Sequence, residues 1–176
     1  FYTGNSGERR AIVIHTMAGF LAGSDSWFKS PDNPGSSSHY GVGLKGQPIS
    51  QYVRLKDSPW TNGKITTGAK WAQRFAFGDP NKYTYTIETE DTYHRDAIGT
   101  AAVSDQQYSD VRDLINQVIL PFDQAAEIKD HGYWIKPLLT GHSAIDPVTR
   151  GACPGPRWTK GRIQKLAEET KLELWI

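Results

Sequence analysis

The sequence predicts an α/β fold in which helices flank a central mixed β-sheet. Short runs rich in β-branched residues or in Tyr and Thr alternate with longer stretches whose apolar residues recur at helical spacing. The order of strand, helix, several strands, helix, strand and helix favours one sheet covered by helices. A chain of 176 residues is long enough for one well-buried core, so we expect a single domain over residues 1–176.

The first half of the chain supplies most of the expected strands. Residues 10–15 form a short β-branched run, and residues 17–29 carry apolar positions typical of a helix. After a loop rich in Pro, Gly and Ser, residues 39–44 and 48–53 indicate two strands joined by a hairpin turn. A short helix around Trp71 and Phe75 and a strand over residues 83–88 follow, and we assign Trp71 to the core.

The second half is mainly helical. Ser104, with Gln107 three residues later, is a capping-box signature, and Val111 and Val118 belong to the apolar spacing of the helix that follows. Pro121 is expected to end or kink that helix, with residues 122–130 continuing it. Residues 137–140 indicate a last strand, and residues 158–172 indicate a closing helix.

Composition excludes several classes of protein. The formal net charge is +1, which gives no strong attraction to nucleic acid or to an anionic membrane. We find no apolar run of about 18 residues, so no membrane span is expected. A single cysteine cannot form an intramolecular disulfide. We therefore expect neither a nucleic-acid partner nor a membrane partner, and no signal peptide is visible.

Two histidines and the single cysteine are candidate zinc ligands. His15 ends the first apolar run, while His142 and Cys153 flank a loop rich in Gly and Pro. Three protein ligands would leave the fourth tetrahedral position open, as in catalytic zinc sites. Each residue alone is more typical of ordinary packing, and the spacing matches neither a helical zinc motif nor a zinc finger. Such a site needs a carboxylate as general base, for which Glu88 is the candidate; strand alternation would place Glu90 on the same face.

Five segments in order resemble the zinc-dependent N-acetylmuramoyl-L-alanine amidases of the type-2 group, which are related to the peptidoglycan recognition proteins and include phage endolysins. They span nearly the whole chain and contain the first-ligand strand, a Ser-x-His-Tyr strand, a loop similar to Ala-Trp-His-Ala-Gly, a strand ending in the catalytic glutamate, and the loop of the second and third ligands. These segments are residues 12–16, 37–42, 58–63, 81–88 and 140–155.

The resemblance implies specific roles. It makes His15, His142 and Cys153 the ligands of Zn²⁺ and Glu88 the general base for hydrolysis of the amide between N-acetylmuramic acid and L-alanine. Arg150 is expected to help bind the oxyanion. The resemblance also implies that peptidoglycan is the partner; Trp60 and Asn62 are candidates for the substrate groove.

The chain departs from the family pattern at several positions. Thr61 stands where many relatives have histidine, and Thr86 stands where glycine is expected before the glutamate. Ser38 replaces a tyrosine that some relatives carry, so a catalytic tyrosine is not expected there. Asp146 is a rival third ligand, but Cys153 directly precedes Pro-Gly, as the third ligand does in the family. His39 is expected to be structural, and His94 and His131 to be solvated.

The expected biological setting is the bacterial cell wall. A phage lysin, made in the host cytoplasm and released to the wall, is the leading interpretation, and a bacterial autolysin with the same activity is an alternative. The chain is expected to be monomeric, and a domain cut from a longer protein with a wall-binding domain stays open. Two other functions stay open as well: a module that binds peptidoglycan without cutting it, and a cysteine peptidase that uses Cys153.

Overall fold

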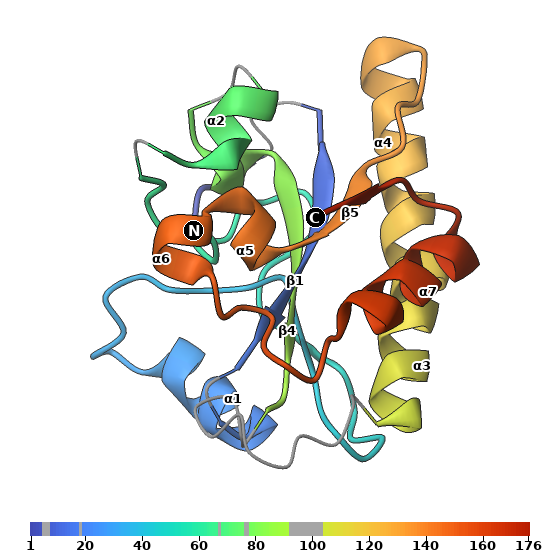
Figure 1. Ribbon diagram of the computed structural model, residues 1–176. Helices are drawn as coiled ribbons and strands as arrows, with labels where there is room; N and C mark the ends of the chain where they lie inside the picture. The colour runs from blue at the N-terminus through green and yellow to red at the C-terminus, as the bar shows by residue number, and fades with distance from the viewer. Residues whose placement is uncertain (5–7, 18, 67, 76–77, 92–103) are drawn as a thin grey trace.

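A six-stranded mixed sheet forms the centre of the computed structural model (Figure 1), which describes residues 1–4, 8–17, 19–66, 68–75, 78–91 and 104–176. The strand order is β3-β2-β4-β1-β5-β6. The strands are β1 (Ala11–Thr16), β2 (Tyr40–Val42), β3 (Ser50–Gln51), β4 (Thr84–Thr89), β5 (Leu138–Gly141) and β6 (Leu174–Trp175).

All neighbouring strands run parallel except β2 and β3, which form the predicted hairpin. The central strand β1 pairs along its whole length with β4 and along four residues with β5. Because β1 is covered on both faces, its five residues Ala11 to His15 are buried and read as a continuous apolar run ending in histidine. The predicted mixed sheet is confirmed, and the two-residue strand β6 at its edge is an addition to it.

The helices differ greatly in length. The longer ones cover the sheet, and the short ones fill the connections near the ends of the strands. They are α1 (Leu21–Lys29), α2 (Lys70–Arg74), η1 (Pro80–Lys82), α3 (Asp105–Leu114), η2 (Ile115–Ile119), α4 (Leu120–His131), α5 (His142–Ile145), α6 (Pro147–Arg150) and α7 (Lys160–Thr170). None of these described helices combines the length and the apolarity that crossing a bilayer requires.

The two faces of the sheet bury separate clusters of apolar side chains. Ile12 and Ile14 of β1 pack in the larger cluster, which contains residues of α3, η2, α4 and α7. Ala11 and Val13, which point the opposite way, pack in a smaller cluster with Trp71 of α2. Figure 1 shows α3, α4 and α7 on one side of the sheet and α2, α5 and α6 on the other.

The segment from Ser104 to His131 is one long helical stretch with a wide turn at η2. Ser104 accepts a hydrogen bond from the backbone N–H of Gln107, as the capping signature predicts. Pro121 lacks an N–H and would crowd the preceding turn of a regular helix, and the π-helical turn at η2 relieves this crowding. The wide turn also shifts the helical register, so Val118 is 41% exposed and its predicted place on the apolar face is wrong.

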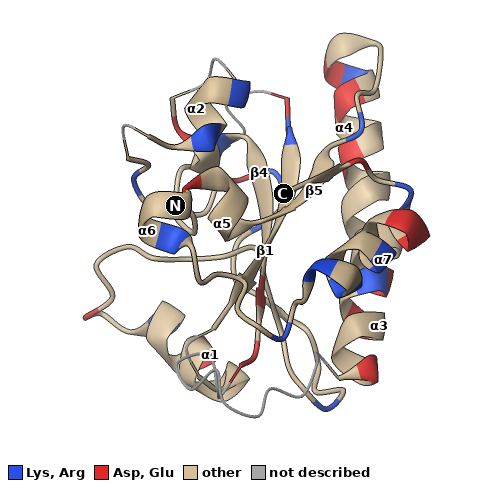
Figure 2. Ribbon diagram, viewed as in Figure 1, with Lys and Arg blue, Asp and Glu red and all other residues tan. Residues whose placement is uncertain are grey.

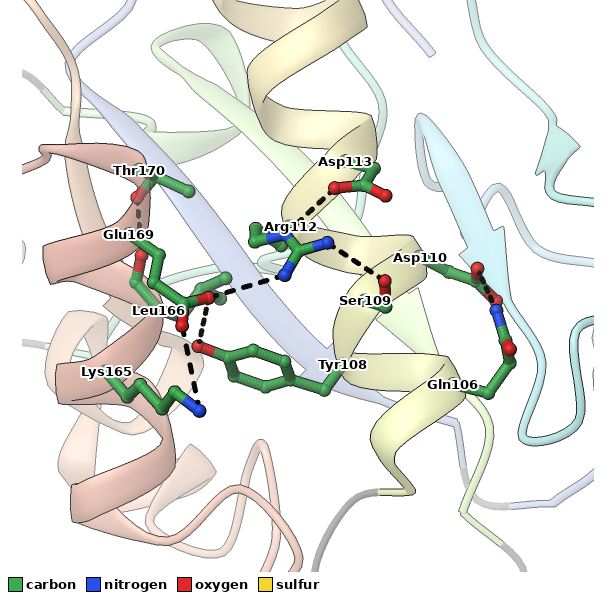
Figure 3. A network of polar contacts seen from close by, with 10 residues as sticks. All are labelled: Gln106, Tyr108, Ser109, Asp110, Arg112, Asp113, Lys165, Leu166, Glu169 and Thr170. Atoms are coloured by element: carbon green, nitrogen blue, oxygen red, sulfur yellow. Dashed lines mark hydrogen bonds and ion pairs between the residues drawn. The ribbon is translucent and has the colours of Figure 1, made fainter.

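The closing helix α7 packs against α3 through a polar network (Figure 3). Glu169 of α7 accepts a hydrogen bond from the hydroxyl of Tyr108 at 3.0 Å and lies 3.7 Å from a guanidinium nitrogen of Arg112. Lys165 pairs with the same carboxylate at 3.6 Å. Figure 2 shows acidic and basic residues intermingled over these helices, in agreement with a net charge of +1.

The first helix begins at Leu21 rather than Met17, and Leu21 is its buried residue, while Trp27 is 45% exposed. The short helices α5 and α6 follow β5 and were not expected from the sequence. Trp71 is fully buried, which confirms its assignment to the core.

Candidate metal centre

The candidate ligands and the candidate base lie at the carboxyl ends of parallel strands. His15 is the fifth residue of β1, and Glu88 of β4 is its direct register partner. His142 follows immediately after β5, which pairs with β1 on the other side. Crevices at the carboxyl ends of strands are the usual ligand sites of open α/β sheets. Strand pairing therefore brings together residues from three distant parts of the chain.

His15, His142 and Cys153 form a compact group of potential ligands. One side-chain donor atom from each lies within 4.8 Å of the other two. The sulfur of Cys153 is 3.9 Å from Nδ1 of His15, and the two imidazole centroids are 4.3 Å apart. Zinc bond lengths with tetrahedral angles place a sulfur and a nitrogen ligand about 3.6 Å apart, so this donor set fits zinc with only a small adjustment.

The loop after β5 holds Cys153 against the end of β1. The backbone N–H of Thr16 donates to the sulfur of Cys153 at 3.4 Å, and the N–H of Ser143 donates to the Cys153 carbonyl at 2.8 Å. Gly141 permits this arrangement, because a Cβ there would lie only 2.7 Å from Cδ of Pro154. The glycine before His142 and the proline after Cys153 thus let the two ligand segments approach each other.

Asn62 supports the histidines from behind. Nε2 of His142 donates to the backbone carbonyl oxygen of Asn62 at 3.0 Å. This leaves Nδ1 of His142 as the nitrogen available to a metal. The amide oxygen of Asn62 and Nε2 of His15 are both buried without a hydrogen-bond partner among the described residues. Asn62 is only 1% exposed, so it supports ligands rather than offering a surface to substrate.

The environment holds both histidines in their neutral form. Burial, together with the nearby charge of His142, lowers the pKa of His15 well below its usual value. Burial likewise lowers the pKa of His142 to about 4. Neutral imidazole is the form that binds metals, so neither residue has to lose a proton near neutral pH.

Glu88 faces the same hollow as the three ligands. A cleft of about 330 Å³ is lined by Glu88, His15, His142, Cys153 and Arg150 together with neighbouring residues. One carboxylate oxygen of Glu88 is buried without a hydrogen-bond partner in the described part of the chain. Burial raises the pKa of Glu88 to about 7, a value suited to exchanging protons with a substrate near neutral pH.

Arg150 lines the cleft that holds the candidate ligands, whereas Trp60 lines a neighbouring hollow. Arg150 ends α6, is exposed, and packs closely over Gly63, where a Cβ would lie 3.0 Å from its guanidinium nitrogen. Trp60 is 37% exposed and lines a separate hollow of about 720 Å³, in which Tyr2 stacks edge-on against it at 5.5 Å. Trp60 and Gly63 place this second hollow beside the cleft that holds Arg150.

The structure separates the rival residues from the centre. Asp146 lies outside the group of donor atoms that come within 4.8 Å of one another, and its oxygens accept hydrogen bonds from Thr66 and from Val148 and Thr149 of α6. His39 is buried, and its Nε2 donates to the carbonyl of Asp57 at 3.1 Å, a structural role. Glu90, which was expected on the same strand face as Glu88, lies beyond the end of β4 and accepts a hydrogen bond from the N–H of Leu44. It does not line the cleft.

The remaining histidines lie elsewhere. His131 is exposed, as expected, and His94 lies outside the described residues.

Sequence reasoning missed the support that Asn62 gives to both ligands and the contact of Thr16 with the cysteine sulfur. It also missed a buried hydroxyl network in which Thr86 contacts Thr61 at 2.9 Å and Ser38 at 3.1 Å. Only the unusual threonines at positions 61 and 86 pointed to that network.

Comparisons with known proteins agree with this architecture. The crystal structure of AmpDh3 from Pseudomonas aeruginosa superposes with a TM-score of 0.66 at 21% identity, covering 99% of this chain and 65% of that one. AmiD from E. coli, solved with anhydro-N-acetylmuramic acid-L-Ala-D-gamma-Glu-L-Lys, gives 0.65 at 24%, covering 97% and 61%. The endolysin LysCS from Clostridium intestinale gives 0.51 at 13%, covering 98% and 93%.

Sequence comparison gives a shorter match. N-acetylmuramoyl-L-alanine amidase A of Achromobacter lyticus is 37% identical over 59 residues, which are 34% of this chain and 33% of that protein. The match thus spans about a third of the curated relative, and no family model matches the chain. At the level of the fold, the resemblance to the type-2 amidases is confirmed: this chain has their mixed sheet with flanking helices.

Proposed function

We propose that this chain is a zinc-dependent N-acetylmuramoyl-L-alanine amidase, which hydrolyses the amide between N-acetylmuramic acid and L-alanine in peptidoglycan. The observation that carries the proposal is the group of His15, His142 and Cys153 in one cleft with Glu88, one carboxylate oxygen of which is buried and has no hydrogen-bond partner among the described residues. Two imidazoles, one sulfur and a nearby carboxylate are the components of a hydrolytic zinc site. The fold shared with structurally known amidases supports the same activity.

The residues of the cleft divide the chemistry between them. A zinc ion held by the three ligands would supply a Lewis acid that activates water and polarises the substrate carbonyl. Glu88 would accept a proton from the attacking water and later deliver it to the leaving amine of L-alanine. Arg150, at the rim, would offer its guanidinium to the negative charge that develops on the carbonyl oxygen.

The neighbouring hollow is the proposed place for the rest of the substrate. It is lined by Trp60 and Tyr2, whose exposed rings offer broad amphipathic faces, and by Lys64 and Asp79, which carry opposite charges. AmiD was solved with a muropeptide, and the superposition with AmiD covers 97% of this chain. We place a peptidoglycan fragment across the cleft and this hollow.

The biological setting is also proposed. A role in phage-mediated lysis is supported by the likeness to the endolysin LysCS, 93% of which is covered. In that setting residues 1–176 act as one monomeric catalytic domain, made in the host cytoplasm and released to the wall. An autolysin would use the same site, and a wall-binding domain elsewhere in a longer chain would be compatible with either.

A catalytic cysteine is disfavoured by the surroundings of Cys153. Burial, followed by the charge of Glu88, raises the pKa of the thiol to about 12, whereas a nucleophilic cysteine needs a depressed value. A pure binding module would have no use for a buried carboxylate facing three potential ligands.

The deciding experiment is mass spectrometry of purified peptidoglycan digested by the protein with chelator and then with added zinc. We expect free L-alanine N-termini on intact glycan chains, lost with chelator and restored by zinc. Glu88→Gln should bind zinc normally but lower the rate by about 10²–10⁴-fold. Glu90→Gln, the same change at a carboxylate outside the cleft, should retain activity.

Three results would contradict the amidase. Absence of released amines in every metal condition, with peptidoglycan still bound, would indicate the binding module. Cleavage within the stem peptide that resists chelator and requires Cys153 would indicate a cysteine peptidase. Full activity of Glu88→Gln would remove the proposed general base.

A further inference from the structure

A second group of potential metal ligands lies away from the cleft. Donor atoms of Glu8, Glu127 and His131 lie within 4.8 Å of one another, as do those of the candidate zinc centre. Glu127 and His131 are four residues apart on α4 and therefore share one face of the helix. Glu8 comes from the segment that leads into β1, so the group joins two distant parts of the chain.

Glu127 is the member whose environment calls for a ligand. The residue is only 4% exposed, and its Oε2 is buried with no hydrogen-bond partner in the described part of the chain. A buried carboxylate oxygen without a partner is costly unless a proton or a cation satisfies it. Asp123, the other buried acid on α4, differs because it accepts hydrogen bonds from Tyr85 and Trp134.

The other members are suitably held. Glu8 accepts a hydrogen bond from the hydroxyl of Tyr133 at 2.6 Å and forms an ion pair with Arg10. His131 is the last residue of α4 and is exposed, so its ring can rotate toward the carboxylates. The carbonyl end of a helix favours a positive charge. The two carboxylates, when ionised, and the guanidinium of Arg10 together carry a net charge of −1, which attracts a cation.

We propose that Glu8, Glu127 and His131 form a second site for a divalent transition-metal ion such as zinc. Two carboxylate oxygens and one imidazole nitrogen are a suitable donor set for such an ion. The donor atoms would close by small side-chain rotations to the separation of about 3 to 3.5 Å that zinc bonds require. Water would complete the coordination on the exposed side. A bound ion would clamp the segment before β1 to the end of α4.

The test counts metal ions on the whole chain. Protein stripped with chelator is titrated with zinc, and bound metal is measured by equilibrium dialysis and elemental analysis. We expect two equivalents for the wild type and one for Glu127→Gln and for His131→Ala. Gln124→Ala, on an exposed position of α4, is the matched control and should keep two equivalents. Because His131 is exposed, its variant should fold normally.

Cobalt identifies which site is filled. The centre with Cys153 should give a thiolate-to-cobalt absorption band in the near ultraviolet, and filling of the second site should add none. Saturation of the second site should also raise the unfolding temperature of the wild type but not of His131→Ala. One equivalent in the wild type that gives the thiolate-to-cobalt band, or a metal count that is unchanged in both Glu127→Gln and His131→Ala, would overturn the proposal. One equivalent without that band, lost in His131→Ala, would instead contradict the centre at Cys153 and support the second site.

Discussion

At the scale of single residues, the centre depends on groups placed behind the ligands as much as on the ligands. The backbone carbonyl oxygen of Asn62 accepts a hydrogen bond from His142. The side-chain amide oxygen of Asn62 is buried, as is Nε2 of His15. Partners of this kind fix the orientation and the tautomer of metal-binding histidines. The cleft also offers one exposed guanidinium, that of Arg150.

Replacing Asn62 by Ala should weaken zinc binding by about 10–100-fold, because it removes the buried amide that interacts with the His15 imidazole. Competition against a chromogenic chelator measures the affinity. Thr84→Val is the control, since it removes only the hydroxyl to which the Asn62 amide donates at 2.9 Å. The control should lower the unfolding temperature and leave most of the affinity. Equal affinities in Asn62→Ala and wild type would exclude this supporting role.

Replacing Arg150 by Ala should lower turnover by about 10²-fold with zinc content unchanged, because the guanidinium is expected to stabilise charge on the carbonyl oxygen. Arg150→Lys should recover part of the loss. Steady-state kinetics on a defined muropeptide, with metal analysis of each preparation, tests this. Turnover of Arg150→Ala equal to wild type would remove Arg150 from the mechanism.

At the scale of elements, the connection after β5 is the specialised part of the fold. Within about a dozen residues it contains His142, two short helices and Cys153, and the side chain of Asp146 caps the second helix. The long stretch from α3 to α4 stays helical throughout, because its π-helical turn accommodates Pro121 without ending the helix.

Gly141→Ala should destabilise the protein by about 1–3 kcal/mol, because the new Cβ would lie 2.7 Å from the Pro154 ring. It should also weaken zinc binding, since relief of this clash moves Cys153. Gly161→Ala in α7 is the control, because a Cβ there meets no atom within 4 Å. Denaturant unfolding of the metal-free proteins gives the comparison, and equal stability of the two variants would contradict the close approach.

At the scale of the whole molecule, burial of titratable groups couples the zinc-free fold to pH. Burial lowers the pKa of His142 to about 4, and it lowers the pKa values of His15 and His39 well below the usual value. In the unfolded chain each histidine titrates near about 6.5. Glu88 acts in the opposite sense, because its pKa is raised to about 7 in the folded state.

Stability of the zinc-free protein should therefore fall as the pH drops from about 6.5 toward 4, because the unfolded state binds more protons on three histidines than the folded state gains on Glu88. Glu88→Gln removes the opposing contribution, so its stability should fall more steeply. Denaturant unfolding at a series of pH values in the presence of chelator measures both slopes. A flat profile for both proteins would contradict the assigned burial of the histidines.

Sequence patterns predicted the order of the main strands and helices, the buried central strand, the capped helix at Ser104 and a possible ligand group of His15, His142 and Cys153. These features depend on local periodicity, turn residues and residue type, which a linear sequence records directly. Sequence patterns did not predict the short helices α5 and α6 or the edge strand β6. The π-helical turn that exposes Val118 was not predictable from the sequence either, because a shift of one residue depends on how the helix packs beyond Pro121.

Which groups meet in the cleft depends on the packing of the whole chain. Strand register placed Glu88 beside His15, and the approach of Pro154 to Gly141 brought Cys153 to the same cleft. The same packing buries Asn62, which the sequence suggested as a candidate for substrate contact. It also places Glu127 beside Glu8. Contacts between residues tens of positions apart arise from the packing of the whole chain, so local sequence patterns do not specify them.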